Sequence, residues 1–282
     1  MVTDCYKRYC DAKNVPFHTI DLVNSWDDTT LFCPAGMQQF KHLFLDTDHI
    51  GTLANNQHCL RIDDLDRLGD GTHFANFHML GLFSFRTLSV KEAIDFWLEF
   101  MATLGLKIDE AHIHPDKLIE WSKFYPNEIT VISDATCEWT DGKIGGYCTE
   151  FYIDGAEVGN IVNPLGTCID VGFGAERLER LVYPNQPALS QEDLLIKAVQ
   201  SIVDAGYIPS NKRQGYVLRK LLRRLRHLNR TDIPFLVEEQ DRQRILRCKY
   251  DRLKHKFSEK PPEWWFDVHG IDINEMIGGE NE

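Results

Sequence analysis

One segment in the middle of the chain restricts the fold more than any other. The runs YCTEFYI (147–153) and AEVGNIV (156–162) are rich in β-branched and aromatic residues, and Asp154-Gly155 separates them. An Asp-Gly pair accepts the positive φ angles of a type I′ turn, the turn that joins the strands of a two-residue hairpin. The segment therefore predicts a β-hairpin and, with it, an antiparallel sheet.

Other segments predict further strands and two helices. Residues 57–61 and 74–85 are apolar and aromatic, and a polar loop joins them. A capping-box pattern at Ser89 begins one helix, which is expected to end at Gly105. A second helix is predicted from Ser190 to a stop near Gly206. Because helices and antiparallel hairpins are intermixed, we expect an α+β protein rather than a doubly wound sheet.

Whole-chain properties limit the compartment and the partners. The chain has 282 residues, a formal net charge of −12 and eight cysteines, none of them in a Cys-x-x-Cys pair. This pattern indicates reduced thiols, so no zinc is expected. The sequence shows neither an apolar run long enough to span a membrane nor a secretory signal pattern, which favours a cytoplasmic protein with no membrane partner. The acidic balance excludes a surface that binds nucleic acid indiscriminately.

A local basic patch lies between Lys212 and Arg230. The stretch KRQGYVLRKLLRRLRHLNR contains eight Lys or Arg and no acid, with apolar residues at helical spacing. Either this is an amphipathic helix with a solvated charged face, or it contacts phosphate groups of a nucleic acid or another polyphosphate. The candidates for such a contact are Lys212, Arg213, Arg219, Lys220, Arg223 and Arg224.

The segment DVGFGAER (170–177) carries a local signal for a ligand. Gly172 and Gly174 precede the start of a predicted helix that includes Glu176 and Arg177. Glycines allow the backbone to approach a ligand closely, and a helix N-terminus favours an anion. A packed turn into a core helix would explain the same pattern, so the segment alone leaves both interpretations open.

Several segments, taken in order, resemble alanyl-tRNA synthetases. They are LFCPAGMQQFKHLFL (31–45), LANNQHCLR (53–61), FHMLGLFSF (77–85), DVGFGAERLERLV (170–182) and GYIPSNKRQGYVLRKLLRR (206–224). They look like motif 1, the two strands of motif 2, motif 3 and the start of that family's helical tRNA-recognition region. The resemblance implies a class II aminoacyl-tRNA synthetase catalytic domain over residues 1–186, with an antiparallel sheet flanked by helices. It also implies a shortened helical domain, with a basic helix and an acidic tail, over residues 187–282.

The resemblance implies a chemistry and a set of residues for it. Amino-acid activation is an in-line attack of a carboxylate on the α-phosphate of ATP, which requires cations around that phosphorus more than a general base. Arg61 and Arg177 match the catalytic arginines of motifs 2 and 3. The implied ATP-binding residues are Arg61, Asp64, Phe77, Glu157, Gly174 and Arg177, with Mg²⁺ held through ATP by Glu157 and Asn160. The implied amino-acid-binding residues are Trp139, Asn160, Val162 and Asp170, the last of which would hold the ammonium group.

The sequence departs from the family pattern in four places. The loop between Arg61 and Gly69 lacks a short insert that lies near ATP and the tRNA acceptor end in the family. His78 stands in place of Glu, exchanging an anion for a group that is largely neutral at pH 7. Gly159 stands in place of Trp, which predicts a larger pocket beside Asn160. Most of the long helical region has no counterpart, and we expect neither an editing domain nor a C-terminal oligomerisation domain.

Three functional hypotheses follow. The first is an alanine–tRNA ligase that uses ATP and Mg²⁺ to form alanyl-adenylate and transfers the alanyl group to the 3′ end of tRNA. The second is a stand-alone ligase that transfers the aminoacyl group to a small amine, a nucleoside or a carrier protein. The third is a regulatory or binding module without activation, against which the retention of Arg61, Arg177 and Asp170 argues. A homodimer through residues 31–45 is compatible with all three.

Overall fold

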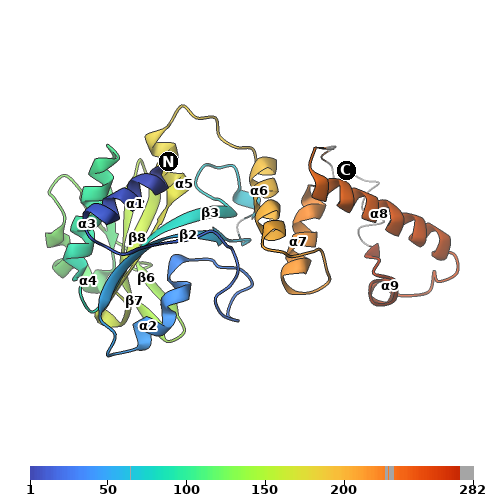
Figure 1. Ribbon diagram of the computed structural model, residues 1–282, viewed down its shortest axis with the longest axis horizontal. Coiled ribbons are helices and arrows are strands. Elements are labelled where there is room, and N and C mark those ends of the chain that lie inside the picture. The colour runs from blue at the N-terminus through green and yellow to red at the C-terminus, as the bar shows by residue number, and fades with distance from the viewer. Residues whose placement is uncertain (64, 226–227, 229–231, 274–282) are drawn as a thin grey trace. The chain divides into compact units, whose positions relative to one another are not determined.

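The protein was analysed as a computed structural model, which describes residues 1–63, 65–225, 228 and 232–273 (Figure 1). The chain forms two compact units, Met1–Gly215 and a second that begins at Tyr216. The boundary between the two compact units therefore falls after Gly215, whereas the family resemblance predicts a domain boundary after residue 186. Within the described residues, no helix is both long and apolar enough to cross a membrane.

A sheet of nine strands forms the centre of the first unit. Eight strands follow the order β1-β2-β3-β9-β8-β7-β4-β5, and β6 pairs with β7. Their bounds are β1 Phe17–Ile20, β2 Gly51–Leu60, β3 Asn76–Phe85, β4 Glu110–Ile113, β5 Thr130–Ser133, β6 Glu138–Asp141, β7 Ile144–Ile153, β8 Ala156–Val162 and β9 Cys168–Gly174. The α+β class and the antiparallel sheet are confirmed. The pairings β2–β3, β3–β9, β9–β8, β8–β7 and β7–β4 are all antiparallel.

The two edges of the sheet differ from the prediction. β1 pairs with β2 in parallel, and β5 pairs with β4 in parallel. Both edge strands have only four residues, so they offer little alternation of polar and apolar side chains for a sequence pattern to detect. The sheet is therefore mixed, with an antiparallel centre and parallel edges.

The central hairpin forms as the sequence predicts. β7 and β8 are joined at Asp154 and Gly155, whose φ angles are 51° and 74°. Both angles are positive, as a type I′ turn requires, and an Asp-Gly pair adopts them with little strain.

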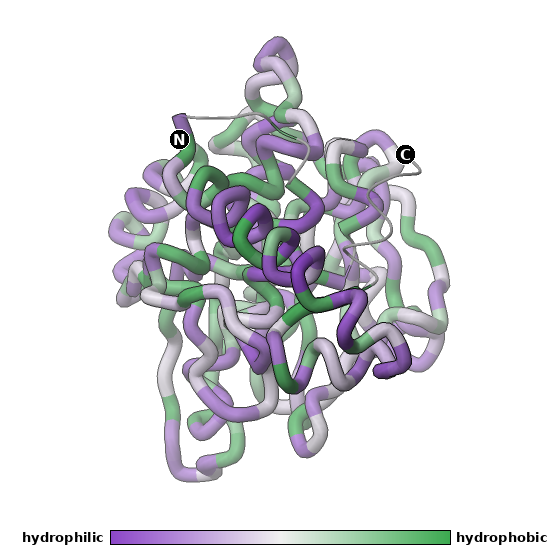
Figure 2. The backbone as a smooth tube through the Cα atoms, turned by 90° about the vertical axis from the view of Figure 1, so that its right-hand side faces the viewer, coloured by the Kyte–Doolittle hydropathy of each residue, from purple (hydrophilic) through white to green (hydrophobic). Residues whose placement is uncertain are grey.

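Helices cover one face of the sheet. The helices of the first unit are α1 Val2–Ala12, α2 Lys41–Leu45, α3 Val90–Thr103, α4 Pro115–Trp121, α5 Ala175–Val182 and α6 Gln191–Asp204. Buried residues of α1, α3 and α4 form one core with the sheet, on the side where Figure 1 shows these helices. Short hydrophobic and hydrophilic stretches alternate along the chain in Figure 2, as expected for elements that each bury one side.

Both helices with predicted boundaries are confirmed. Ser89 caps α3 through the backbone N–H of Glu92, whose side chain accepts from Ser89 in return. Ser190 caps α6 in the same way through the N–H of Asp193. Helix α3 packs into the core of the sheet, where the Trp97 ring stacks on Phe173 of β9 with centroids 4.0 Å apart.

The opposite face of the sheet is only partly covered. The 3₁₀ helix η1 (Gly36–Phe40) and α2 pack there, and Met37, Phe40 and Phe44 form a second cluster with Phe83 and Phe85 of β3. The neighbouring part of this face, over β8 and β9, therefore remains available for a cavity.

The second unit is helical. It contains most of α7 (Arg213–Arg224), together with α8 (Pro234–Leu253) and α9 (Pro262–His269). The predicted basic helix is confirmed by α7. Trp265 of α9 is buried together with Ile271, and Leu246 and Tyr250 of α8 pack against them. The predicted acidic tail lies mostly outside the described residues, which end at residue 273.

Gly159 does not enlarge the space beside Asn160, so that expectation is wrong. A Cβ atom at Gly159 would point toward the helix-covered face and approach the Phe173 ring to 2.4 Å. The Phe173 ring fills this space and is itself fixed by Trp97. The glycine is therefore required by packing in the core, and only its backbone lines the cavity on the other face.

We predict that Gly159→Ala destabilises the protein by about 1–3 kcal/mol, because the new methyl group would overlap the Phe173 ring. Urea unfolding followed by circular dichroism measures this change. Gly51→Ala is the matched control: it is also a strand glycine, but its added Cβ would meet only His49, at 3.8 Å. Equal stability of the two variants would contradict this account of Gly159.

Candidate active site

One cavity of about 680 Å³ lies in the first unit, a size typical of small-molecule sites. The predicted site residues described by the structure line it together: Arg61, Phe77, Trp139, Glu157, Asn160, Val162, Asp170, Gly174 and Arg177. Asp64 lies outside the described residues. Residues from distant parts of the chain thus meet around a common space, as the predicted site requires. Their individual roles remain predictions.

Strand β9 explains why the site forms on this face. Its side chains alternate: Val171 and Phe173 are buried in the core beneath α3, whereas Asp170, Gly172 and Gly174 line the cavity. Gly172 pairs with Gly81 of β3 on one side and with Asn160 of β8 on the other. Gly172 lines the cavity with backbone alone, so a ligand can approach the sheet closely there, whereas Phe83 and Asn55 fill the space over Gly81.

A β-bulge in β8 brings Glu157 into the site. Gly159 pairs with Phe151 and Glu157 pairs with Tyr152, so Val158 is an extra residue in the ladder. In a regular strand, Glu157 and Asn160 would point to opposite faces, because they are three residues apart. The bulge resets the alternation, and both side chains line the cavity. Their oxygen atoms are hard donors of the kind that Mg²⁺ prefers, so this wall of the cavity fits the predicted metal.

The two arginines are oriented by backbone carbonyl groups. Arg61 donates from Nε to the carbonyl of Pro34 (2.8 Å), and its Cζ lies 5.1 Å from the centre of the Phe77 ring. Arg177 donates from Nε to the carbonyl of Thr72 (2.8 Å), and its Nη1 lies 3.1 Å from the Glu157 carboxylate. The carbonyl of Pro34 holds Arg61 without neutralising its charge, whereas the Glu157 carboxylate offsets part of the charge of Arg177, so Arg61 offers the stronger positive potential to an anion.

Asp170 is a carboxylate without a counterion. The side chain has no hydrogen-bond or ion-pair partner among the described residues, and burial raises the pKa of Asp170 from 3.8 to about 7. Val162 and Phe83 are its register neighbours on the adjoining strands, and both are apolar. The free energy of this ionised carboxylate would fall if a cation entered the cavity, so the position is suited to an ammonium group.

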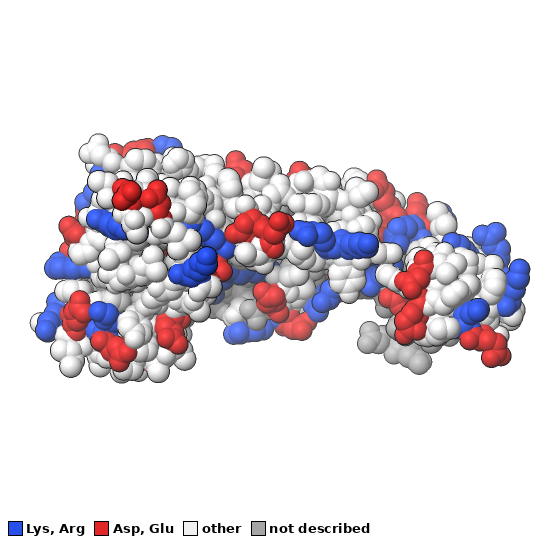
Figure 3. Space-filling view, turned by 90° about the horizontal axis from the view of Figure 1, so that it is seen from below, with Lys and Arg blue, Asp and Glu red and all other residues white. Residues whose placement is uncertain are grey.

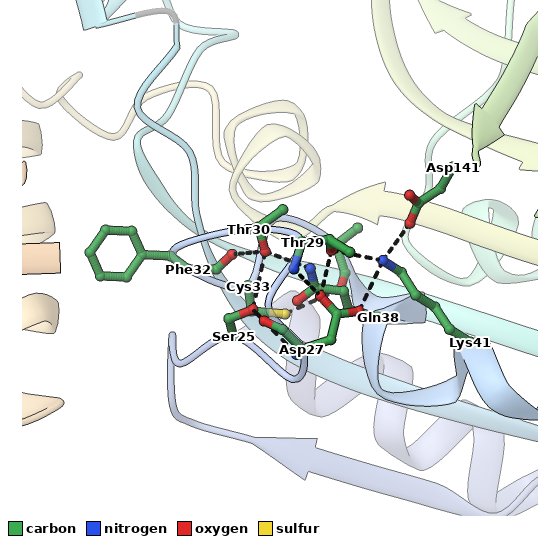
Figure 4. A network of polar contacts seen from close by, with 10 residues as sticks. Ser25, Asp27, Thr29, Thr30, Phe32, Cys33, Gln38, Lys41 and Asp141 are labelled. Atoms are coloured by element: carbon green, nitrogen blue, oxygen red, sulfur yellow. Dashed lines mark hydrogen bonds and ion pairs between the residues drawn. The ribbon is translucent and has the colours of Figure 1, made fainter. Parts of the chain in front are cut away.

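Lys41 joins two walls of the cavity, a role that was not assigned from the sequence. Its Nζ contacts the carboxylates of Asp27 (3.2 Å) and Asp141, and also the Thr29 hydroxyl (3.2 Å), as Figure 4 shows. Burial opposes the charge, but the contacts with Asp141 and Asp27 outweigh it and raise the pKa of Lys41. Lys41 is the last residue of the segment AGMQQFK, which is part of the family resemblance and could have identified it as a candidate.

Gln38 was also missed. It is 4% exposed, donates to the Thr30 hydroxyl (2.6 Å) and lines the cavity. Its Oε1 has no hydrogen-bond partner among the described residues. A buried acceptor at a cavity wall can receive a hydrogen bond from a ligand at little further desolvation cost.

His78 is held by Glu176 rather than left isolated. The Glu176 carboxylate accepts from the backbone N–H of His78 (2.9 Å) and lies 3.0 Å from its Nδ1. The hydrogen bond with Glu176 raises the pKa of His78, although partial burial opposes that shift. The side chain is therefore more readily protonated than the sequence comparison suggested. Glu176 itself lines the cavity, so it supplies a carboxylate close to the place where the family has one.

The basic candidates separate into two groups. Lys212, Arg213 and Lys220 are exposed. Arg219 is 4% exposed, with its guanidinium 5.5 Å from the Phe266 ring, and Arg223 pairs with Asp272 at 3.8 Å. Burial of Arg219 does not support its predicted contact with phosphate. Arg224 is intermediate in exposure. Figure 3 shows basic and acidic side chains intermingled on the face in view.

Comparison with known proteins gives a consistent result. The sequence model of the family described as tRNA synthetases class II (A) matches residues 9–160. An alanine–tRNA ligase of Endomicrobium trichonymphae is 29% identical over 276 residues, which cover 72% of this chain and 32% of that protein. An alanine–tRNA ligase of Chlamydia muridarum is 26% identical over 296 residues, covering 77% of this chain and 34% of that protein.

The chain spans about a third of the length of the curated relatives it matches. Among solved structures, a pyrrolysyl tRNA synthetase of Desulfitobacterium hafniense aligns with a TM-score of 0.43 and 14% identity, covering 67% of this chain and 72% of that one. A likeness at this level does not bear on function.

We predict that Asp170→Asn stabilises the protein, and more so at about pH 8 than at about pH 5. The pKa of Asp170 is raised on folding, so the folded state binds the extra proton and its ionisation penalty grows as the pH rises from about 4 to about 7. The asparagine carries no such penalty, so the gain in unfolding free energy reaches up to about 4 kcal/mol above neutral pH. Urea unfolding at both pH values measures it.

Asp48→Asn is the control for this prediction, because Asp48 is an exposed carboxylate of the same type. It should change the unfolding free energy by less than about 0.5 kcal/mol at either pH. A pH-independent effect of Asp170→Asn would show that the carboxylate is not held in an apolar setting.

Proposed function

The chain belongs to the family described as tRNA synthetases class II (A), and on that premise we propose that it activates alanine with ATP and transfers the alanyl group to the 3′ end of tRNA. The observation that carries this proposal is the meeting of Arg61, Arg177 and Asp170 around one cavity. Two guanidinium groups suit a triphosphate, and a carboxylate without a counterion suits an ammonium group. A module that only binds a partner would not need this combination.

The nucleotide is expected to occupy the side of the cavity formed by β3 and α5. Adenine would stack on Phe77, where the Arg61 guanidinium now lies, so Arg61 has to rotate from the ring toward the α-phosphate. Arg177 would meet the γ-phosphate with the part of its fork that is not directed at Thr72 or Glu157. The N-terminus of α5, at Gly174, adds a favourable dipole for the phosphates.

The amino acid is expected to bind over β8 and β9. Asp170 would hold the ammonium group, and Val162 and Trp139 would form the wall that limits the side chain. Val162 is 3% exposed and packs against Trp139, so this wall is firmly supported. A rigid apolar wall discriminates between side chains that differ by a methylene group by about 1–3 kcal/mol.

The chemistry requires positioning and charge stabilisation. The amino-acid carboxylate attacks the α-phosphorus in line with the departing pyrophosphate, and Arg61 stabilises the charge that develops there. Glu157 and Asn160 would hold Mg²⁺ through ATP, and the ion supplies charge neutralisation for the leaving phosphates. Asp170 has to be ionised to hold the ammonium group, so activation is expected to weaken as the pH falls through about 7.

An acceptor other than tRNA is the alternative, and one observation favours it. Burial of Arg219 and the pairing of Arg223 with Asp272 turn part of the basic helix away from solvent. The surface available for contact with tRNA phosphates is smaller than the sequence suggests. A small amine, a nucleoside or a carrier protein would need less of that surface.

We predict that Arg61→Ala and Arg177→Ala each lower kcat/KM for alanine-dependent ATP–pyrophosphate exchange by about 100-fold or more. Each removes a charged donor from the place where negative charge develops in the transition state. Arg244→Ala is the control, because Arg244 is an exposed residue of α8 that pairs with Asp241. Near-normal exchange in either cavity variant would remove that arginine from the proposed mechanism.

We predict that the double variant Lys212→Ala, Lys220→Ala lowers kcat/KM for charging of tRNA by roughly tenfold and leaves ATP–pyrophosphate exchange unchanged. The two exposed lysines would contact phosphates without taking part in activation. Transfer of labelled alanine to total tRNA measures charging, and Lys91→Ala on α3 is the control. Active exchange without any charging by the unmodified protein would favour the alternative acceptor.

A further inference from the structure

Two thiols and a carboxylate meet beside the cavity, in a combination that the proposed activation chemistry does not use. The Sγ atoms of Cys137 and Cys148 and a carboxylate oxygen of Glu150 all lie within 4.8 Å of one another. Cys137 is fully buried and Cys148 is 2% exposed. This is the one such group of His, Cys, Asp and Glu side chains found in the described part of the chain.

Strand pairing creates the group. The backbone N–H of Cys148 donates to the carbonyl of Cys137 (2.8 Å), so the two cysteines face each other across the β6–β7 hairpin. Glu150 lies two residues beyond Cys148 on the same face of β7. The sequence gives no sign of this arrangement, because the two cysteines are eleven residues apart and belong to no metal-binding spacing.

We infer that Cys137, Cys148 and Glu150 bind a Zn²⁺ ion, with water or another small ligand in the fourth position. Thiolate sulfur and carboxylate oxygen are zinc ligands, and three protein ligands with one open position make a complete tetrahedral site. With bonds of about 2.0–2.3 Å, the ligand atoms of such a site lie roughly 3.5 Å apart. Small rotations of the side chains bring the three groups from their present separations to that distance.

The surroundings of Glu150 leave it able to bind a cation. The Tyr152 hydroxyl donates to its Oε2 (2.9 Å), and Glu150 takes part in no ion pair among the described residues. Metal binding would release one proton from each thiol, so three negative groups would surround a doubly charged ion. The hydrogen bond from Tyr152 would fix the carboxylate, as supporting contacts do in metal sites.

The position of the site indicates what the ion would do. Cys148 pairs with Val162, and Val162 pairs with Asp170, so the three residues form one row across β7, β8 and β9. At the usual spacing of strands, Cys148 lies roughly 10 Å from Asp170. Cys137 immediately precedes β6, which carries Trp139. The zinc would therefore fix β6 against β7 and hold the apolar wall of the cavity in place, whatever amino acid binds there.

The test is metal content and metal affinity of the full chain. Protein purified with a reductant and without a metal-affinity column should contain about one zinc per chain by mass spectrometry. After removal of zinc with a chelator, Co²⁺ should produce the absorption bands of a tetrahedral thiolate complex, and Zn²⁺ should abolish them. These readouts do not depend on catalytic activity, so they separate this inference from the proposed function.

Variants identify the ligands. Cys148→Ser should lose stoichiometric zinc and the thiolate-to-cobalt absorption, whereas Glu150→Gln, which keeps both thiols and the side-chain shape, should weaken Zn²⁺ binding by about tenfold or more. Cys59→Ser is the matched control, because Cys59 belongs to another buried thiol pair, with Cys33, that no carboxylate joins among the described residues. It should keep its zinc. Circular dichroism verifies folding, and Glu150→Gln decides the matter if Cys148→Ser does not fold.

Three results would overturn the inference. One is unmodified protein with substoichiometric zinc and no cobalt absorption. Another is zinc affinity that is the same in Glu150→Gln as in the unmodified chain. The last is a Cys137–Cys148 disulfide in peptides from protein alkylated without a reductant, because two oxidised sulfurs cannot bind the ion.

Discussion

The buried carboxylate of Asp170, which lines the cavity and has no cationic partner among the described residues, is the constraint on which the rest of the site depends. Its raised pKa shows that the fold loses free energy by keeping this group ionised. Burial on the reverse side of the same strand offsets that loss. Phe173 and Val171 alternate with the cavity residues and pack beneath α3, where Trp97 stacks on Phe173. A ligand ammonium group would recover the lost free energy, so the desolvated carboxylate favours binding of a cation.

The same strand also links packing to specificity. Because the side chains of β9 alternate, a change on the core side moves the backbone that forms the cavity floor at Gly172. Gly159 illustrates this connection, since its missing side chain leaves room for Phe173 and not for a ligand. A residue that looks like an alteration of the pocket in a sequence comparison is therefore part of the core, and it affects the site through the position of the strand.

The features that the sequence predicts well are those with local patterns. The Asp154-Gly155 turn, the caps of α3 and α6 and the segments around Arg61 and Arg177 all depend on neighbouring residues. The features that were missed depend on contacts between elements, which the pattern of one element does not encode. The bulge at Val158 and the meeting of Cys137 with Cys148 follow from the register of neighbouring strands, and the bridge from Lys41 to Asp141 joins a helix to a strand. Arg219 was misplaced for the same reason, because α9 covers it from a later part of the chain.

The two steps of the proposed reaction, activation of the amino acid and transfer to the acceptor, depend on different parts of the chain. The groups proposed for activation line one cavity, with Asp170 on β9, Arg61 directly after β2 and Arg177 in the first turn of α5, and the departures at Gly159 and His78 leave that arrangement intact. The groups for the acceptor lie on a helix whose charged residues are partly turned inward. Under the proposed function, activation is strongly constrained by the fold, whereas recognition of the acceptor would rest on a few exposed side chains such as Lys212 and Lys220. Such a chain would change its acceptor by substitutions in and around α7 without disturbing the chemistry at the α-phosphate.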